Sequence, residues 1–206
     1  MPKPKPGTDP LLDQLRSAIP ESCIVSDTVS MKPYECDGLS GYRQMPRVVV
    51  LPKTVEQVRA VMKICQKTGT PIVPRGAGTS LSGGAMPHKN GVVLSLARLN
   101  RILNIDEGNR TARVQAGVRN LQISEAVQHL GLYYAPDPSS QIACTIGGNV
   151  AENAGGVHCL KYGLTVHNIL QIKMVNLDGE LISIGGTTLE SPGYDLLALL
   201  RGSEGM

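Results

Sequence analysis

An apolar strand, an amphipathic helix and a second strand follow one another near the start of the chain, and this order limits the fold more than any other feature. Residues 47–51 read RVVVL, a continuous apolar run typical of a strand that is buried on both faces. Thr54 and Gln57 have the spacing of a capping box, and apolar side chains then recur at helical intervals until Gly69. A short strand is expected over residues 71–74. Because two strands joined through a helix lie parallel, the sequence predicts a βαβ unit.

The later part of the chain has the pattern of an antiparallel lobe. Residues 111–116 alternate between apolar and polar side chains, as in a strand of a different sheet. The strongest hairpin signal is Asp178-Gly179, which stands between two apolar runs. The hairpin strands are expected at residues 169–177 and 180–184. Two further strands, at 92–96 and 102–105, are expected before the boundary between the lobes. The predicted fold class is therefore α+β, a small parallel βαβ lobe followed by an antiparallel α+β lobe.

Helices are expected at two further places. One begins at Thr8 or Asp9 and runs over residues 11–19, and the other runs over residues 121–130 with Asn120 as its cap and Gly131 at its end. The polar stretch 21–45 is expected to be irregular. The predicted division is a tail and helix at 1–32 and a main domain at 33–206, with lobes at about 33–108 and 109–206.

Composition excludes several classes of protein. Hydrophobic residues make up 41% of the 206 residues and charged residues 18%, which is the balance of a folded globular chain. The net charge of +3 is spread along the chain, and Trp and Phe are absent, so nucleic-acid binding is not expected. No apolar stretch of about 18 residues predicts a membrane span. The proline-rich start, Met1–Gly7, lacks the apolar core of a signal peptide and is interpreted as a disordered tail.

Cysteine and histidine placement argues against a metal or disulfide framework. The five cysteines are odd in number and show no Cys-x-x-Cys spacing, which is typical of a reducing compartment and favours the cytoplasm. No His-Glu-His constellation is present, so no metal site is predicted. His88 and His129 are expected to be exposed, and His167 to open a strand.

The first segment that indicates chemistry is residues 74–84, Pro-Arg-Gly-Ala-Gly-Thr-Ser-Leu-Ser-Gly-Gly. Four glycines within nine residues directly after a strand let the backbone approach a ligand closely, and three hydroxyls add donors, which suits a pyrophosphate. The Rossmann pattern fails at Leu81, where its third glycine belongs, and the P-loop pattern fails at Gly84, where its lysine belongs. The alternative interpretation is a plain glycine-rich turn.

The second segment is residues 137–156, Asp-Pro-Ser-Ser-Gln-Ile-Ala-Cys-Thr-Ile-Gly-Gly-Asn-Val-Ala-Glu-Asn-Ala-Gly-Gly. It is small, polar and punctuated by two Gly-Gly pairs eight residues apart. A loop this long is easier to explain as a binding surface than as scaffold. Small side chains leave room for a flat ring, and backbone amides can meet its carbonyls and nitrogens.

Both segments resemble the flavin-binding loops of the vanillyl-alcohol-oxidase type (PCMH-type) of FAD-binding domain. The pairing of R-G-x-G-T-S-L-S-G-G with D-P-S-S-Q-I-A-C-T-I-G-G is similar to the family formed by glycolate oxidase D subunits and D-lactate dehydrogenases. Residues 33–39, 156–166 and 193–205 extend the match, so the resemblance covers the chain from about Pro33 to its end.

The resemblance implies that FAD is the cofactor and that four segments contact it. The first segment would wrap the pyrophosphate, the second would line the isoalloxazine and ribityl portion, the third would support the cofactor from the neighbouring turn, and the fourth would begin a loop at the adenylate end. The first comprises Pro74, Arg75, Gly76, Ala77, Gly78, Thr79 and Ser80. The second comprises Ser139, Ser140, Gln141, Ile142, Ala143, Cys144, Thr145, Gly148 and Asn149. The third comprises Glu152, Asn153, Ala154 and Gly155, and the fourth Gly202, Ser203, Glu204 and Gly205.

Three side chains near these segments have alternative interpretations. Thr79 stands where covalent members of the superfamily often carry histidine, so the resemblance implies non-covalent FAD. Cys144 lies near the second segment and is interpreted as a buried core residue, with a cysteinyl-flavin bond as the alternative. His158 is the histidine near the predicted flavin, and it is interpreted as a hydrogen-bonding wall residue, with a catalytic base as the alternative.

The resemblance also implies an activity and partners. The activity is oxidation of a small 2-hydroxyacid such as glycolate or D-lactate, with transfer of the Cα hydrogen as hydride to flavin N5 and of electrons to partner subunits. The implied partners are a second flavin-type subunit and an iron–sulfur subunit, with a peripheral link to a membrane quinone pool. The substrate (cap) domain is expected to be absent, because the chain stops inside a loop that would continue as G-S-E-G-x-L-G. No catalytic residue is therefore assigned.

Two other functions remain open at this point. One is a catalytically silent module that binds FAD, or nothing, because the chain is truncated. The other is an FAD oxidoreductase of another substrate class on the same fold, such as a sugar-lactone oxidase or a nucleotide-sugar reductase.

Overall fold

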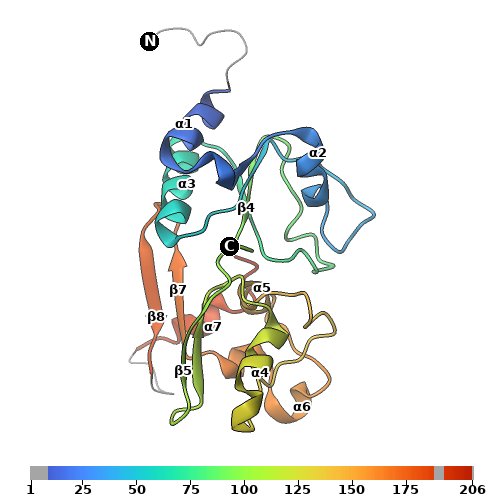
Figure 1. The fold of residues 1–206 in the computed structure, drawn as a ribbon, viewed down its shortest axis with the longest axis vertical. Coiled ribbons are helices and arrows are strands. Elements are labelled where there is room, and N and C mark those ends of the chain that lie inside the picture. Colours follow the sequence, from blue (N-terminus) through green and yellow to red (C-terminus); the bar gives the residue numbers. More distant parts are fainter. Residues whose placement is uncertain (1–8, 188–192, 206) are drawn as a thin grey trace.

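The computed structural model describes residues 9–187 and 193–205, so the expected N-terminal tail lies outside the described residues. The first lobe is built on a four-stranded sheet with the strand order β1-β2-β4-β3 (Figure 1). The central strands β2 (Val48–Val50) and β4 (Val92–Ser95) are parallel, and β3 (Ile72–Arg75) lies parallel to β4 at one edge. The predicted βαβ unit is confirmed, and β4 lies between its two strands.

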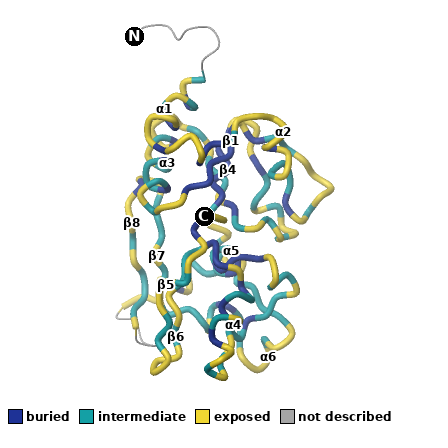
Figure 2. Tube along the Cα trace, viewed as in Figure 1, coloured by how far each residue is buried: buried dark blue, intermediate teal, exposed yellow. Residues whose placement is uncertain are grey.

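Complete burial of the two central strands explains why both read as continuous apolar runs. Their alternate side chains enter two separate cores. Val48 and Val50 pack with α1 (Pro10–Ala18) and α3 (Val55–Thr68), whereas Val49 packs on the opposite face with Met31. Figure 2 shows this buried centre and the exposed outer edges of the lobe.

The helix signals of the first lobe are confirmed by their hydrogen bonds. Asp9 caps α1 by accepting from the Leu11 N–H, and Thr54 caps α3 by accepting from the Gln57 N–H. The Gln57 side chain completes the turn differently from a capping box, because its Oε1 accepts from the N–H of Lys53 at 2.7 Å. Gly69 ends α3 with a left-handed conformation (φ +62°), as predicted.

The stretch 21–45 is more regular than its polar sequence predicted. It contains the two-residue strand β1 (Ile24–Val25), the short helix α2 (Thr28–Met31), and two 3₁₀ turns, η1 (Glu21–Cys23) and η2 (Lys32–Tyr34). β1 pairs antiparallel with β2, an arrangement that a two-residue strand cannot signal by periodicity.

The second lobe contains two antiparallel hairpins and several short helices. The first hairpin joins β5 (Ile102–Asp106) to β6 (Thr111–Val114), and the second, the predicted one, joins β7 (Gln171–Val175) to β8 (Leu181–Gly185). The boundary placed at about residue 108 falls in the turn of the first hairpin, and the division into lobes stays a prediction. The helical elements are α4 (Asn120–Val127), η3 (Gln128–Leu130), α5 (Ile146–Glu152), α6 (Cys159–Tyr162), η4 (Thr165–Asn168) and α7 (Leu196–Leu200).

Three predictions for this lobe were wrong. Asn120 is the first residue of α4 and not its cap, because its buried amide bonds to groups outside the helix. Residues 146–152 form α5, although the whole segment 137–156 was expected to be a loop. His167 lies in η4 and does not open a strand. At Asn120 and at the start of α5, contacts with distant residues override the local sequence preference, whereas His167 bonds within its own turn to Leu164.

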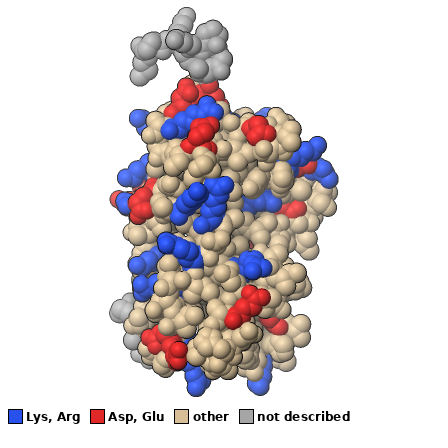
Figure 3. All heavy atoms as spheres, in the orientation of Figure 1, with Lys and Arg blue, Asp and Glu red and all other residues tan. Residues whose placement is uncertain are grey.

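Charged side chains of both signs are mixed on the surface (Figure 3). On the face shown in Figure 3, Lys and Arg side chains are scattered along the molecule with Asp and Glu between them. Among the described residues, no helix combines the length and the apolar character that a membrane span requires.

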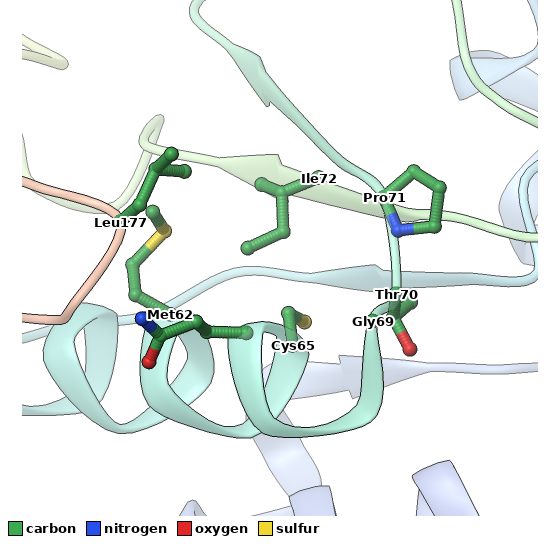
Figure 4. Close-up of a pocket in the computed structure, with 8 residues that line it drawn as sticks. Met62, Cys65, Gly69, Thr70, Pro71, Ile72 and Leu177 are labelled. Carbon is green, nitrogen blue, oxygen red and sulfur yellow. The ribbon is translucent and has the colours of Figure 1, made fainter.

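The turn of the second hairpin packs against α3 and so joins the two lobes. Arg59 Nε donates to the Gly179 carbonyl at 2.9 Å, and Gln66 bonds to Asp178. Beside this contact lies an apolar hollow (Figure 4). Burial raises the pKa of the Cys65 thiol in its wall to about 11, which keeps the thiol protonated at neutral pH. The hollow is lined by Met62, Cys65, Gln66, Gly69, Thr70, Pro71, Ile72 and Leu177.

We expect Gly179→Ala to destabilise the protein by about 1–3 kcal/mol. A Cβ there would lie 2.6 Å from Lys63 Cγ and 2.8 Å from the Arg59 carbonyl, in addition to the strain of φ +72°. Gly131→Ala is the matched control, since Gly131 has φ +69° and no neighbouring atom within 4 Å of a Cβ. Urea unfolding measures the unfolding free energy of both variants. Equal losses would show that the packing of the turn against α3 does not contribute to stability.

Candidate cofactor site

Helix α5 belongs to the second predicted binding segment, residues 137–156. It lies at the side of the second lobe that faces the first lobe (Figure 1). Its first turn is fixed by backbone bonds from Ile146 N–H to the Val118 carbonyl (2.9 Å) and from Gly147 N–H to the Ala116 carbonyl (2.8 Å). A Cβ at Gly147 would lie 2.9 Å from the Ala116 Cβ, so this helix position is glycine because another backbone passes close by.

A buried amide network holds α5 against the loop before it. Asn120 is 1% exposed, and its Nδ2 donates to the Pro136 carbonyl and to Asn149 Oδ1, both at 2.9 Å. Asn149 Nδ2 in turn lies 3.2 Å from the Cys144 sulfur. The side chains of Cys144 and Asn149 therefore face the interior, and Cys144 takes the buried role that the sequence favoured.

The first glycine-rich segment meets the second at Gly76. A Cβ at Gly76 would overlap with Thr145 Oγ1 and lie 3.9 Å from the Gly148 nitrogen. Thr145 is 5% exposed, and its hydroxyl oxygen has no hydrogen-bond partner within the described residues. The two segments, about 70 residues apart in the sequence, thus form one surface only because position 76 lacks a side chain.

Residues 202–205 cap the other end of α5. Gly202 N–H donates to the Val150 carbonyl at 2.9 Å, and Glu204 N–H donates to the Ala151 carbonyl at 2.8 Å. A Cβ on Gly205 would lie 3.5 Å from Pro74, which brings this turn beside the first segment. All four predicted segments therefore converge around α5.

The charges near this junction are distributed unevenly. A Cβ on Gly84 would lie 3.1 Å from Glu204 Oε2 and 3.6 Å from Glu152 Oε1. Two carboxylates at the Gly84 end disfavour an anion there, so the Gly76–Ser80 end is the better place for a phosphate. Arg75 is buried, as are the predicted contacts Cys144 and Asn149: its side chain is only 7% exposed, and burial lowers the pKa of its guanidinium group.

An Asp–His pair closes the second segment. His158 Nδ1 and Asp137 Oδ2 lie 2.6 Å apart, and this hydrogen bond lowers the pKa of the Asp137 carboxyl. A Cβ at Gly156 would overlap with the Asp137 carbonyl, so the two ends of the segment touch. His158 is exposed. Its interpretation as a wall residue of the cofactor site stays a prediction. Asp137 is the member of this pair that the sequence did not single out.

Comparisons with known proteins agree with this arrangement. A sequence profile of the FAD binding domain matches residues 46–185. The chain is 60% identical over 196 residues to the glycolate oxidase subunit GlcD of Escherichia coli, covering 95% of this chain and 39% of that protein. It is 36% identical over 200 residues to the D-lactate dehydrogenase of Anaerostipes hadrus, covering 96% and 42%.

The chain belongs to the family of FAD-binding domains. The solved structure of alkyldihydroxyacetonephosphate synthase superposes with a TM-score of 0.81 at 21% identity, covering 98% of this chain and 41% of that one, which shows the same fold. The predicted fold class and the predicted family are therefore confirmed. The chain spans about two fifths of the length of the relatives it matches.

The junction at α5 fits an FAD-binding domain on its own geometry. Gly76 and Gly78 lie in the same loop as the hydroxyl residues Thr79 and Ser80, and Gly78 has a positive φ (+71°). Glycine-rich turns of this kind can present successive backbone N–H groups to a pyrophosphate. The buried Thr145 hydroxyl with no partner lies directly behind Gly76. No set of His, Cys, Asp and Glu side chains suited to a metal ion occurs in the part of the chain that the structure describes.

We expect Gly76→Ala to weaken FAD binding roughly 10- to 100-fold, because the new methyl group forces the segments apart at Thr145. Fluorescence titration with FAD measures the change. Gly41→Ala is the control, since a Cβ there meets no atom within 4 Å.

The double variant Gly76→Ala/Thr145→Ala should recover most of the lost affinity, because it removes the overlapping hydroxyl. Wild-type affinity in Gly76→Ala would show that the two segments do not form the cofactor surface.

Proposed function

We propose that this chain is the FAD-binding part of a flavin-dependent 2-hydroxyacid dehydrogenase that acts on glycolate or D-lactate. The observation that carries the proposal is the contact of Gly76 with Thr145 at the start of α5, in a chain 60% identical to a glycolate oxidase subunit. This contact brings together the two glycine-rich segments, residues 74–84 and 137–156. Their small and polar sequences are the least typical of a purely structural loop.

The four segments would divide the cofactor between them. Backbone N–H groups of Gly76 to Ser80 would hold the pyrophosphate, away from the carboxylates of Glu152 and Glu204. The exposed residues Ser139, Ile142 and Ala143 would line the ring system, whereas Cys144 and Asn149 would support this wall from inside. Residues 152–155 and 202–205 would complete the site around the end of α5.

The protein's own contribution would be binding and orientation. When bound, the isoalloxazine supplies an acceptor for two electrons. The Asn120 network would keep the wall rigid, and the Asp137–His158 pair would keep the second segment closed beside the ring. The proposed partners are a second flavin-type subunit and an iron–sulfur subunit that pass electrons to a membrane quinone pool, with the chain itself cytoplasmic or peripheral to the inner face of the membrane. Their support is that relatives are named as a subunit of glycolate oxidase.

Denaturation should release FAD from the purified chain. The motivation is Thr79, which cannot form a histidyl-flavin bond, and the burial of Cys144 at 4% exposure. Acid precipitation should leave the yellow colour in the supernatant. Flavin that stays with the pellet would contradict non-covalent binding.

The activity can be tested in a chimera in which this chain replaces the matching part of the Escherichia coli glycolate oxidase subunit, loaded with FAD and mixed anaerobically with substrate. We expect glycolate or D-lactate to bleach the flavin at about 1 per second or faster, and glucose to leave it oxidised. The 206-residue chain alone, saturated with FAD, should show no bleaching at this rate, because no substrate-orienting group is assigned among the residues that the structure describes. Bleaching by glucose and not by hydroxyacids would favour another substrate class. A bound flavin that neither class reduces would favour the silent module.

A further inference from the structure

Arg75 is the charged side chain of the first glycine-rich segment, and it lies beneath that segment. Its Nη1 donates to the Cys36 carbonyl at 2.7 Å and lies 3.4 Å from the Ala85 carbonyl. The guanidinium carbon lies 5.7 Å from the centre of the Tyr34 ring. Because the residue is 7% exposed, its charge faces the interior and not the surface on which a phosphate would lie.

The guanidinium group fills the space behind Gly78. A Cβ on Gly78 would overlap with Nη2 and lie 2.9 Å from Nε. The backbone of the segment therefore rests directly on the guanidinium plane at the residue whose φ is +71°. The guanidinium group of Arg75 therefore determines the position of the Gly78 backbone relative to the protein interior.

Residues 34–39 form the other side of this support. A Cβ on Gly38 would lie 2.9 Å from the Thr79 carbonyl and 2.8 Å from the Ser80 carbonyl, so the two stretches touch backbone to backbone. The Glu35–Arg43 ion pair (2.8 Å) and the bond from Gln44 N–H to the Glu35 carbonyl (2.8 Å) hold residues 34–39 in place. These residues precede the part matched by the family profile, which begins at residue 46.

Burial lowers the pKa of the Arg75 guanidinium group, and the charge of the Asp37 carboxylate raises it by a smaller amount. Asp37 is 6% exposed; its Oδ1 accepts from the Leu39 N–H at 2.9 Å, and its Oδ2 has no hydrogen-bond partner within the described residues. A buried cation needs such a neighbour, because desolvation of an uncompensated charge is costly.

We propose that Arg75 is a positioning residue for FAD binding. It holds the loop at Gly78 from beneath, together with Asp37 and Gly38, and leaves the phosphates to the backbone N–H groups and hydroxyls of residues 76–80. This assignment rests on the proposed placement of FAD. It predicts that the shape of the guanidinium group matters, and that its charge is neutralised inside the protein.

The first test needs no FAD. Urea unfolding is measured for the wild type, Gly78→Ala, Arg75→Lys and the double variant. Gly78→Ala should cost less unfolding free energy in the Arg75→Lys background, because a lysine does not place a planar group behind residue 78. Equal costs in both backgrounds would overturn the proposal, whatever the fate of the proposed function.

The second test measures FAD affinity at several salt concentrations. Arg75→Lys should weaken binding about tenfold although the charge is kept, with a salt dependence equal to that of the wild type. Arg98→Lys is the control, since Arg98 also donates to a carbonyl, that of Ser22 at 2.6 Å, but is exposed and bonds to the η1 turn and not to the loop. Wild-type affinity in Arg75→Lys, or a weaker salt dependence in it, would overturn the proposal.

A double variant that removes both buried charges distinguishes a positioning role of Arg75 from an effect on stability alone. Arg75→Gln/Asp37→Asn should recover most of the unfolding free energy that Arg75→Gln loses, because no buried charge is left uncompensated. FAD affinity should stay about tenfold below that of the wild type, because the guanidinium plane is still missing. If the unfolding free energy and the FAD affinity both recover, Arg75 is only a structural residue. If neither recovers, Asp37 does not offset the charge of Arg75. Each outcome would overturn the proposal. Failure of FAD placement is detected separately, by unchanged affinity in Gly76→Ala.

Discussion

The buried amide of Asn120 is the interaction on which the rest of the site depends. It bonds to the Pro136 carbonyl and to Asn149 and so ties the loop before α5 to the helix itself. An amide buried without these partners would cost about 1–3 kcal/mol, so the network is stable only when all its members are in place. The network fixes the position of helix α5. Thr145 then contacts Gly76, and residues 202–205 bond to the last turn of the helix.

The two glycine-rich segments look alike in the sequence, but their glycines have different roles in the structure. In the first, the glycines allow close approach to Thr145 at position 76 and a left-handed backbone at position 78. In the second, Gly147 lies inside a helix and is needed because Ala116 passes alongside. The same residue type thus allows contact with a side chain and a left-handed turn in one place and close packing of another chain segment in the other.

Much of the fold was predictable because its signals are local. The runs that became β2 and β4 are fully buried and read as apolar, and Thr54 and Gly69 mark the ends of α3 through their own hydrogen bonds and backbone angles. Helix α5 was missed because two glycines disfavour a helix, and tertiary contacts outweigh that preference here. Asn120 was misread as a cap because its partners lie 16 and 29 residues further along the chain.

The sequence by itself determined the order of the main elements, the burial of the first strand on both faces and the family, since each depends on residue types at short spacing. It also identified the segments that surround α5. Only the tertiary structure decided which way their side chains point. Arg75, Cys144 and Asn149 were expected at the cofactor, and all three side chains are buried behind the surface that the cofactor would contact. The physical reason is that a side chain's direction is set by the backbones packed against it, and those come from residues 34–39 and 116–120, which no local pattern connects to the loops.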